Sequence, residues 1–250
     1  MISLIKEIKK KKELSDIANS IVKQAVQNYL LKHHIELKET TPSDKKIILK
    51  EVRADLRLFS GRFQKNTKNR LQLLNQNKIK ELLKTHASTS ERLPYYQTLK
   101  AKINSLKISS ILDLGCGLNP IAIANPNLEY YASDIKEDEL SLIKRYFKKN
   151  KIKGKVFICD LTKSFNNFPK TDLTIIFKVL DILPSNHSLS ENLLNSIKSK
   201  YILVSFSTKK LSGKPMNFPQ RLWFERILRK NAFSFDKFQS QNEIFYLITK

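Results

Sequence analysis

The stretch Ile111-Leu-Asp-Leu-Gly-Cys-Gly-Leu-Asn-Pro120 decides the fold of this chain. An apolar run ends in an acid, and a Gly-x-Gly turn follows it. Gly115 and Gly117 lack side chains, so the backbone there can turn sharply and approach a ligand closely. Dinucleotide dehydrogenases have a third glycine where this chain has Pro120. The stretch therefore indicates a parallel strand that leads into a cofactor-binding loop of another kind.

Two further strand patterns each end in an acid, in Tyr130-Tyr-Ala-Ser-Asp134 and Val156-Phe-Ile-Cys-Asp-Leu161. A carboxylate at Asp134 can accept two hydrogen bonds from ribose hydroxyls. Asp160 can accept one from an adenine amino group, and Leu161 can cover the ring. An ordinary turn could explain either acid alone. Three acids after three consecutive strands, however, predict a site for S-adenosylmethionine (SAM).

Strands and helices alternate in the second part of the chain, which predicts a mostly parallel sheet with an antiparallel edge. The expected strands are 108–114, 128–134, 155–159, 172–177, 201–206, 232–238 and 243–249. The expected helices are 136–150, 188–199 and 218–230. The fold class is α/β, a Rossmann-like SAM-dependent methyltransferase with a seven-stranded sheet and a helical N-terminal domain.

The first part of the chain has apolar residues at helical spacing. Pro42 and Ser43 are expected near the start of one helix, and Gly61 at its end. A further helical pattern covers 71–83. We therefore predict two domains: a basic helical RNA-docking domain over 1–107 and a SAM-binding methyltransferase domain over 108–250.

The charge is far from balanced, with 46 Lys and Arg against 23 Asp and Glu. Residues 1–110 carry 24 of these cations and 10 of the acids, a net charge of +14. Such a surface favours polyanions, because binding releases counterions from phosphates. A lysine-rich proteome would explain part of the excess, but its size favours nucleic acid as the partner.

The cysteines and histidines indicate no metal site and no disulfide framework. Cys116 and Cys159 are the only cysteines, and each follows a strand pattern. The sequence contains no run of 18 apolar residues, so no membrane span is expected. The first residues lack the features of a secretory signal. We expect a cytoplasmic monomer with no metal and no membrane contact.

Several segments together resemble one family. They are His86-Ala-Ser-Thr-Ser-Glu-Arg-Leu-Pro-Tyr-Tyr96, Asp113-Leu-Gly-Cys-Gly-Leu-Asn-Pro120, Ile176-Phe-Lys-Val-Leu-Asp-Ile-Leu-Pro184, Ser205-Phe-Ser-Thr-Lys-Lys-Leu-Ser-Gly213 and Trp223-Phe-Glu225. The combination looks like the aminoglycoside-resistance 16S ribosomal RNA methyltransferases of the Arm/Rmt type. That family methylates N7 of a guanine in the decoding site of the 30S subunit. The resemblance covers roughly 86–225 and, more loosely, the basic N-terminus.

The resemblance implies a role for particular residues. The cofactor would be bound by Phe63, His86, Ala87, Ser88, Arg92, Gly115, Asp134, Asp160, Leu161 and Phe177. The guanidinium of Arg92 offers a bidentate fork that suits the methionine carboxylate of SAM. The residues expected to bind RNA are Arg53, Arg57, Lys178, Lys209 and Lys210. Lys178 would also lie near the methyl group. No residue is expected to act as a catalytic base.

Two features leave the RNA target open. Ser207 stands where many members of the family have proline, and Lys214-Pro-Met-Asn-Phe-Pro219 replaces a stretch rich in glycine and methionine. The alternatives are methylation of another ribosomal base or of a tRNA, and a ribosome-binding factor without catalysis. Guanine N7 has a free lone pair and needs no general base, whereas methylation at pyrimidine C5 needs a nucleophilic cysteine. The absence of an obvious catalytic residue favours N7.

Overall fold

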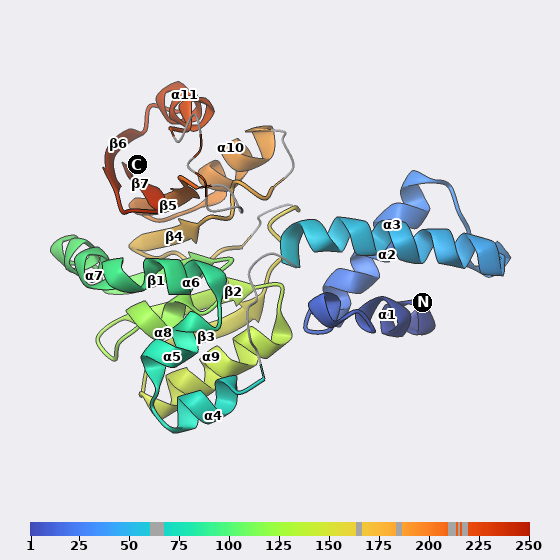
Figure 1. The fold of residues 1–250 in the computed structure, drawn as a ribbon. Helices are drawn as coiled ribbons and strands as arrows, with labels where there is room; N and C mark the ends of the chain where they lie inside the picture. Colours follow the sequence, from blue (N-terminus) through green and yellow to red (C-terminus); the bar gives the residue numbers. More distant parts are fainter. Residues whose placement is uncertain (61–67, 164–166, 184–186, 210–213, 215, 217–219) are drawn as a thin grey trace.

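The computed structural model describes residues 1–60, 68–163, 167–183, 187–209, 214, 216 and 220–250. Figure 1 shows two lobes, a small helical one formed by the N-terminal helices and a larger one built around a sheet. None of the described helices is long and apolar enough to cross a membrane.

The larger lobe contains a seven-stranded sheet in the order β3-β2-β1-β4-β5-β7-β6. Its strands are β1 (Ser110–Leu114), β2 (Glu129–Asp134), β3 (Lys153–Ile158), β4 (Leu173–Phe177), β5 (Tyr201–Ser207), β6 (Ser234–Gln239) and β7 (Glu243–Thr249). The pairs from β3 to β5 are parallel, and β7 is antiparallel to both β5 and β6. The predicted seven-stranded, mostly parallel sheet is confirmed.

Helices cover both faces of this sheet, because the central strands are apolar on both sides. One face packs against α4 (Arg70–Asn75), α5 (Ile79–Lys84), α7 (Tyr96–Ser105), α8 (Asn119–Ile123) and α9 (Glu137–Lys149). The other face packs against α10 (His187–Ser196) and α11 (Leu222–Lys230). Neighbouring residues of β1 alternate between the two layers: Ile111 belongs to the first and Leu112 to the second.

The smaller lobe has its own hydrophobic core. It contains α1 (Ile2–Lys9), α2 (Asn19–Lys32) and α3 (Pro42–Ser60), with short 3-10 helices at Lys12–Leu14 and Leu37–Glu39. The expected helix start at Pro42 is confirmed. The Thr41 amide donates to the Asp44 carboxylate, and the Asp44 amide donates to the Thr41 hydroxyl. This reciprocal pair satisfies amides that a helix start leaves open.

One local prediction before the sheet was wrong. The pattern over 71–83 forms two helices, α4 and α5, because Asn77 takes a left-handed conformation with a φ of 58°. The segment after α5 forms α6 (Ala87–Arg92), with His86 at its N-cap. A 3-10 turn at Leu93–Tyr95 follows it, and Pro94 lies in that turn.

The lobes join at the segment that follows β2. Ala18 donates its amide to the carbonyl of Ile135 at 2.9 Å, and Glu137 donates to the carbonyl of Asp16 at 2.8 Å. Ile135 also packs against the core of the smaller lobe. The division of the chain at residue 107 stays a prediction. The packing adds that α4, α5 and α7 share a core with the sheet.

An aromatic cluster under α11 should dominate the stability of the larger lobe. Phe206 is fully buried and meets the rings of Phe224 and Tyr246 at 4.9 and 5.8 Å. Phe206→Ala should lower the free energy of unfolding by about 3–5 kcal/mol, because it leaves a cavity. Urea denaturation measures this loss. The control Phe235→Ala removes a half-buried ring and should cost less; an equal cost would contradict the role of the cluster.

Candidate functional site

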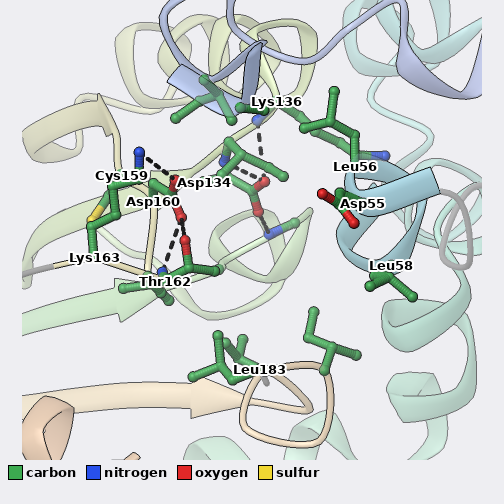
Figure 2. A pocket seen from close by; sticks show the side chains of 18 of the residues that line it. Asp55, Leu56, Leu58, Asp134, Lys136, Cys159, Asp160, Thr162, Lys163 and Leu183 are labelled. Carbon is green, nitrogen blue, oxygen red and sulfur yellow. Dashed lines mark hydrogen bonds and ion pairs between the residues drawn. The ribbon is translucent and has the colours of Figure 1, made fainter. Parts of the chain in front are cut away.

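A cavity of about 490 Å³ lies between the two lobes, at the carboxyl ends of β1 to β4. This is the edge at which open α/β sheets bind their ligands, and the volume is in the usual range for cofactors. The predicted site residues that line it are His86, Ser88, Gly115, Asp134, Asp160, Leu161, Phe177 and Lys178. Part of this lining is drawn in Figure 2.

The turn after β1 needs both of its glycines. Gly115 and Gly117 have φ values of +65° and +50°, which L residues with side chains rarely adopt. A Cβ atom at Gly115 would lie 2.6 Å from a methyl group of Val179, and one at Gly117 would lie 2.9 Å from the His86 ring. A side chain at either position would collide with Val179 or His86, so the turn requires glycine at both positions.

Asp134 holds the turn and the end of β2 together. Its carboxylate accepts the amides of Gly117 at 2.9 Å and of Ile135 at 2.7 Å, as Figure 2 shows in part. Burial raises the pKa of Asp134 to about 6, and the nearby charge of Glu139 acts in the same direction. The carboxylate lines the cavity and keeps acceptor capacity beyond these two bonds.

Asp160 lies at the neighbouring strand end. Its carboxylate accepts both the amide and the hydroxyl of Thr162, at 2.9 and 2.6 Å. The ammonium of Lys163 lies 3.9 Å from the other oxygen. Leu161 is buried beside it in the cavity wall. The structure thus brings both acids and the leucine that sequence analysis proposed to one side of one cavity.

Asp113, the first of the three acids, has a different position. It is buried and does not line the cavity. Its carboxylate accepts the hydroxyl of Tyr130 at 2.7 Å and the amide of Asn119 at 2.8 Å. Burial raises the pKa of Asp113 to about 6. Asp113 therefore has a structural role, in which it joins the end of β1 to β2 and α8.

His86 lies against the turn from the side of α6. Burial lowers the pKa of His86 to about 4, so the ring is neutral at pH 7. Ser88 lines the same wall, whereas Ala87 does not. A neutral ring is compatible with close packing against a cofactor that itself carries positive charge.

Arg92 does not line the cavity. It is 2% exposed, and its guanidinium donates to the carboxylate of Glu243 at 2.9 Å. The same guanidinium lies 4.4 Å from the centre of the ring of Phe177, which lines the cavity. Sequence analysis missed Glu243, because nothing near β7 links it to the Arg92 segment.

Lys178 belongs to the same buried charge cluster. Its ammonium pairs with Glu91 and, at 3.3 Å, with Glu243. Lys178 is 7% exposed and has a φ of 57°, so the backbone after β4 is turned sharply at the cavity. Together, Arg92 and Lys178 surround one acid from two elements far apart in sequence.

The smaller lobe supplies a large part of the cavity lining, which sequence analysis did not predict. This helical wall contains Tyr29 from α2 and His33 at the C-cap of that helix, whose rings lie 4.3 Å apart, and Asp55, Leu56 and Leu58 from α3. In Figure 2 the residues of α3 face the strand-end acids across the cavity. Helical periodicity reveals which residues share a face, but not which other lobe that face meets.

The proposed RNA-binding residues lie in several places. Arg53 is half-buried and donates to the carbonyl of Glu7, whereas Arg57 is exposed and pairs with Glu13 at 2.8 Å. Lys209 is half-buried, just after β5. Lys210 and the proposed cofactor residue Phe63 lie outside the described residues.

A sheet in which only β7 runs antiparallel, with a glycine turn after β1 and an acid after β2 on one cavity, defines the class of Rossmann-like SAM-dependent methyltransferases. Within that class, the profile of the ribosomal RNA methyltransferase (FmrO) family matches residues 73–247. The chain belongs to this family, as its resemblance to the Arm/Rmt type predicted.

Relatives in this family are described as 16S rRNA (guanine(1405)-N(7))-methyltransferases. The protein from Serratia marcescens is 32% identical over 177 residues, which cover 69% of this chain and 70% of that protein. The protein from Frankia casuarinae is 27% identical over 181 residues, which cover 69% of this chain and 64% of that protein. The chain thus spans slightly less than two thirds of the Frankia protein.

Solved structures agree over nearly the whole chain. The 16S rRNA methylase RmtB is 26% identical, with a TM-score of 0.77 over 99% of this chain and 97% of that one. RmtF, solved in complex with S-adenosyl-L-homocysteine, shares the fold with a TM-score of 0.80 at 24% identity, over 99% of this chain and 97% of that one. The helical lobe is therefore part of the shared fold.

The raised pKa of Asp134 predicts that SAM binding depends on pH. An acid whose pKa is raised to about 6 carries its charge above that pH and loses it below. Calorimetric SAM affinity should fall about fourfold between pH 7.0 and 5.5, since a neutral carboxyl is the weaker acceptor.

Two variants isolate the group responsible. Asp134→Asn should bind SAM less tightly, with a flat profile over this range. Asp113→Asn removes the buried acid that also has a pKa of about 6, and it should keep the pH dependence. A profile that is flat in the unmodified protein, or only in Asp113→Asn, would contradict the role of Asp134.

Proposed function

We propose that this chain is a SAM-dependent methyltransferase that modifies N7 of a guanine in the decoding site of 16S rRNA within the 30S subunit. The observation that carries the proposal is the cavity in which Asp134 and Asp160 lie beside the Gly115 turn, in a chain of the ribosomal RNA methyltransferase family. The guanine that the relatives' names give as 1405 is the natural candidate.

The described residues fit SAM in their chemistry. Asp134 would accept from the ribose hydroxyls, and Asp160 with Leu161 would hold the adenine. Gly115, His86 and Ser88 would lie along the methionine part, since all three line the cavity. Ala87 and Phe63 extend this proposed set by family resemblance alone. When bound, SAM supplies an electrophilic methyl group on a sulfonium.

Arg92 remains the proposed partner of the methionine carboxylate. In the structure the guanidinium donates to Glu243 through Nε and Nη2, and its Nη1 donates to the Tyr96 hydroxyl and the Asn119 side-chain oxygen, both at 3.4 Å. A cofactor carboxylate would replace these two longer contacts of Nη1. Arg92 would thus bind two carboxylates, one from the protein and one from the cofactor. Phe177 and Lys178 would face the methyl group and the target base, since both line the cavity after β4.

The ionisation states at the cavity favour N7 over positions that need covalent catalysis. Cys159 lines the cavity, but burial raises its pKa to about 11, so it stays a thiol at neutral pH. A thiol is a poor nucleophile, which disfavours methylation at pyrimidine C5. Guanine N7 requires only approach in line with the transferred methyl, and positioning alone can supply several kcal/mol, on the order of 7.

The substrate would be held mainly by the basic N-terminal part of the chain, residues 1–110, which includes the smaller lobe. The net charge of +14 over these residues supports this, with +5 on residues 1–60 and +9 on residues 61–110, as do Arg57 on α3 and Lys209 near the carboxyl end of β5. We propose that the protein acts as a monomer in the cytoplasm on 30S subunits, without a metal ion.

N7 methylation adds a positive charge to the purine and removes a hydrogen-bond acceptor. Cationic aminoglycosides should therefore bind the methylated decoding site less well.

The product can be identified chemically. N7-methylguanosine makes an RNA strand cleavable by borohydride and aniline, so 30S subunits treated with the protein and SAM should give one primer-extension stop at a decoding-site guanine. Asp134→Ala should weaken SAM binding by about 1–3 kcal/mol and reduce the stop. Methyl incorporation without such a stop, or a methyl found on adenine, would refute the N7 assignment. Naked rRNA and tRNA serve as the competing substrates.

A further inference from the structure

The most concentrated positive charge in the larger lobe lies away from the cofactor cavity. The segment Lys144-Arg-Tyr-Phe-Lys-Lys-Asn-Lys-Ile-Lys-Gly-Lys155 has seven Lys and Arg residues among twelve and no acid. It covers the second half of α9 and the start of β3. β3 is one of the two edge strands of the sheet, so this charge lies along an edge. We name this segment, with the adjoining part of β2, the basic edge.

A groove of about 640 Å³ runs along the basic edge. Lys144, Lys148 and Lys155 line it, and all three side chains are exposed. Its floor includes Tyr131 and Phe157, which are half-buried. The register pairs Tyr131 with Lys155, and Phe157 follows two residues later on the same face. Aromatic rings and cations therefore share one surface.

The neighbouring charges do not neutralise these three lysines. Among the described residues, no acid forms an ion pair with Lys144, Lys148 or Lys155. The acids of α9 lie in its first turn, at the opposite end of the helix. Glu129 is engaged by the hydroxyl of Tyr131 at 2.8 Å and lies opposite Lys153.

Lys149 is different, because it has a structural role. Its ammonium donates to the carbonyl of Leu74 at 2.9 Å and to that of Asn75 at 3.3 Å. These bonds join the end of α9 to the end of α4. Lys149 is therefore not counted among the cations that are available to a partner.

We propose that the basic edge is a second RNA-binding surface, which holds the phosphate backbone of the ribosomal substrate. Its ligand is an RNA strand whose phosphates meet the lysines and whose bases can contact Tyr131 and Phe157. A basic groove with aromatic rings is how proteins bind single-stranded nucleic acid. The inference rests on the proposed function, because it assumes an RNA substrate, and it adds a contact on the lobe that carries the chemistry.

The position of β3 connects this surface to the cofactor cavity. The same strand leads from Lys155 at the groove to Cys159, Asp160 and Leu161 in the cavity wall. Five residues of extended chain span about 16 Å. One RNA molecule can thus contact the groove while its target base enters the cavity, and contact on both lobes would fix its orientation.

The test removes the three lysines together. Lys144→Gln/Lys148→Gln/Lys155→Gln is compared with Lys80→Gln/Lys100→Gln/Lys198→Gln, which removes three exposed lysines of the same lobe scattered over α5, α7 and the segment after α10. Binding to 30S subunits and to naked 16S rRNA is measured over a series of salt concentrations. SAM affinity and melting temperature show whether each variant is folded.

The groove variant should reduce the magnitude of the negative slope of log affinity against log salt by about 2–3 on both RNAs, since three phosphate contacts are lost. Its KM for subunits should rise while kcat at saturation and SAM affinity stay unchanged. The control variant should change the slope by less than one. Equal slopes in the two variants would overturn the proposal. If the groove variant bound subunits more weakly but naked RNA as before, the proposal would be overturned. The partner of the basic edge would then be a ribosomal protein.

Failure of the proposed function gives a different result. In that case the unmodified protein produces no methylated guanine on subunits, whatever the variants do. The salt dependence on naked RNA still decides whether the basic edge binds phosphates, because that measurement requires no methyl transfer.

Discussion

The arrangement of this protein depends on the carboxylate of Asp134 and the backbone that follows it. That carboxylate accepts the amides of Gly117 and Ile135, so it fixes the glycine turn relative to the end of β2. The carbonyl of Ile135 then accepts the amide of Ala18, which attaches the helical lobe at the same point. One short segment therefore sets the cofactor turn and the position of the opposite cavity wall. A change in it alters both.

A second constraint comes from the buried charges behind the cavity. Glu243 lies between Arg92 and Lys178, and its removal would leave two buried cations with fewer partners. Breaking such an arrangement is costly, because a buried charge without compensation is unfavourable by several kcal/mol, about 3–5. The cluster joins α6, the turn after β4 and the antiparallel strand β7. It thereby holds the segments proposed to bind the methionine part and the target base in a fixed relation.

Sequence alone predicted the elements whose signal is local. All seven strands were expected to within a few residues, because each is a short apolar run between polar turns, and the acids after β2 and β3 were placed correctly at the cavity. The split at Asn77 was missed, since a left-handed residue leaves the apolar spacing almost unchanged. Glu243 and the helical wall were missed because their roles arise from contacts between distant segments. No periodicity encodes which carboxylate a buried arginine will meet.

The proposed chemistry explains why most residues of the site would position the substrates and would not take part in the reaction. Transfer to a purine nitrogen with a free lone pair requires no proton acceptor, and the titratable groups at the cavity are suited to holding rather than reacting. His86 is neutral and Cys159 remains a thiol. In the proposed reaction, specificity therefore comes from how the RNA is positioned against the protein. The cavity is lined by the strand ends of the sheet and by the helical lobe, so a target base would enter between the two. The proposed selection of one guanine thus depends on how the lobes are held together, which again leads to the segment after β2.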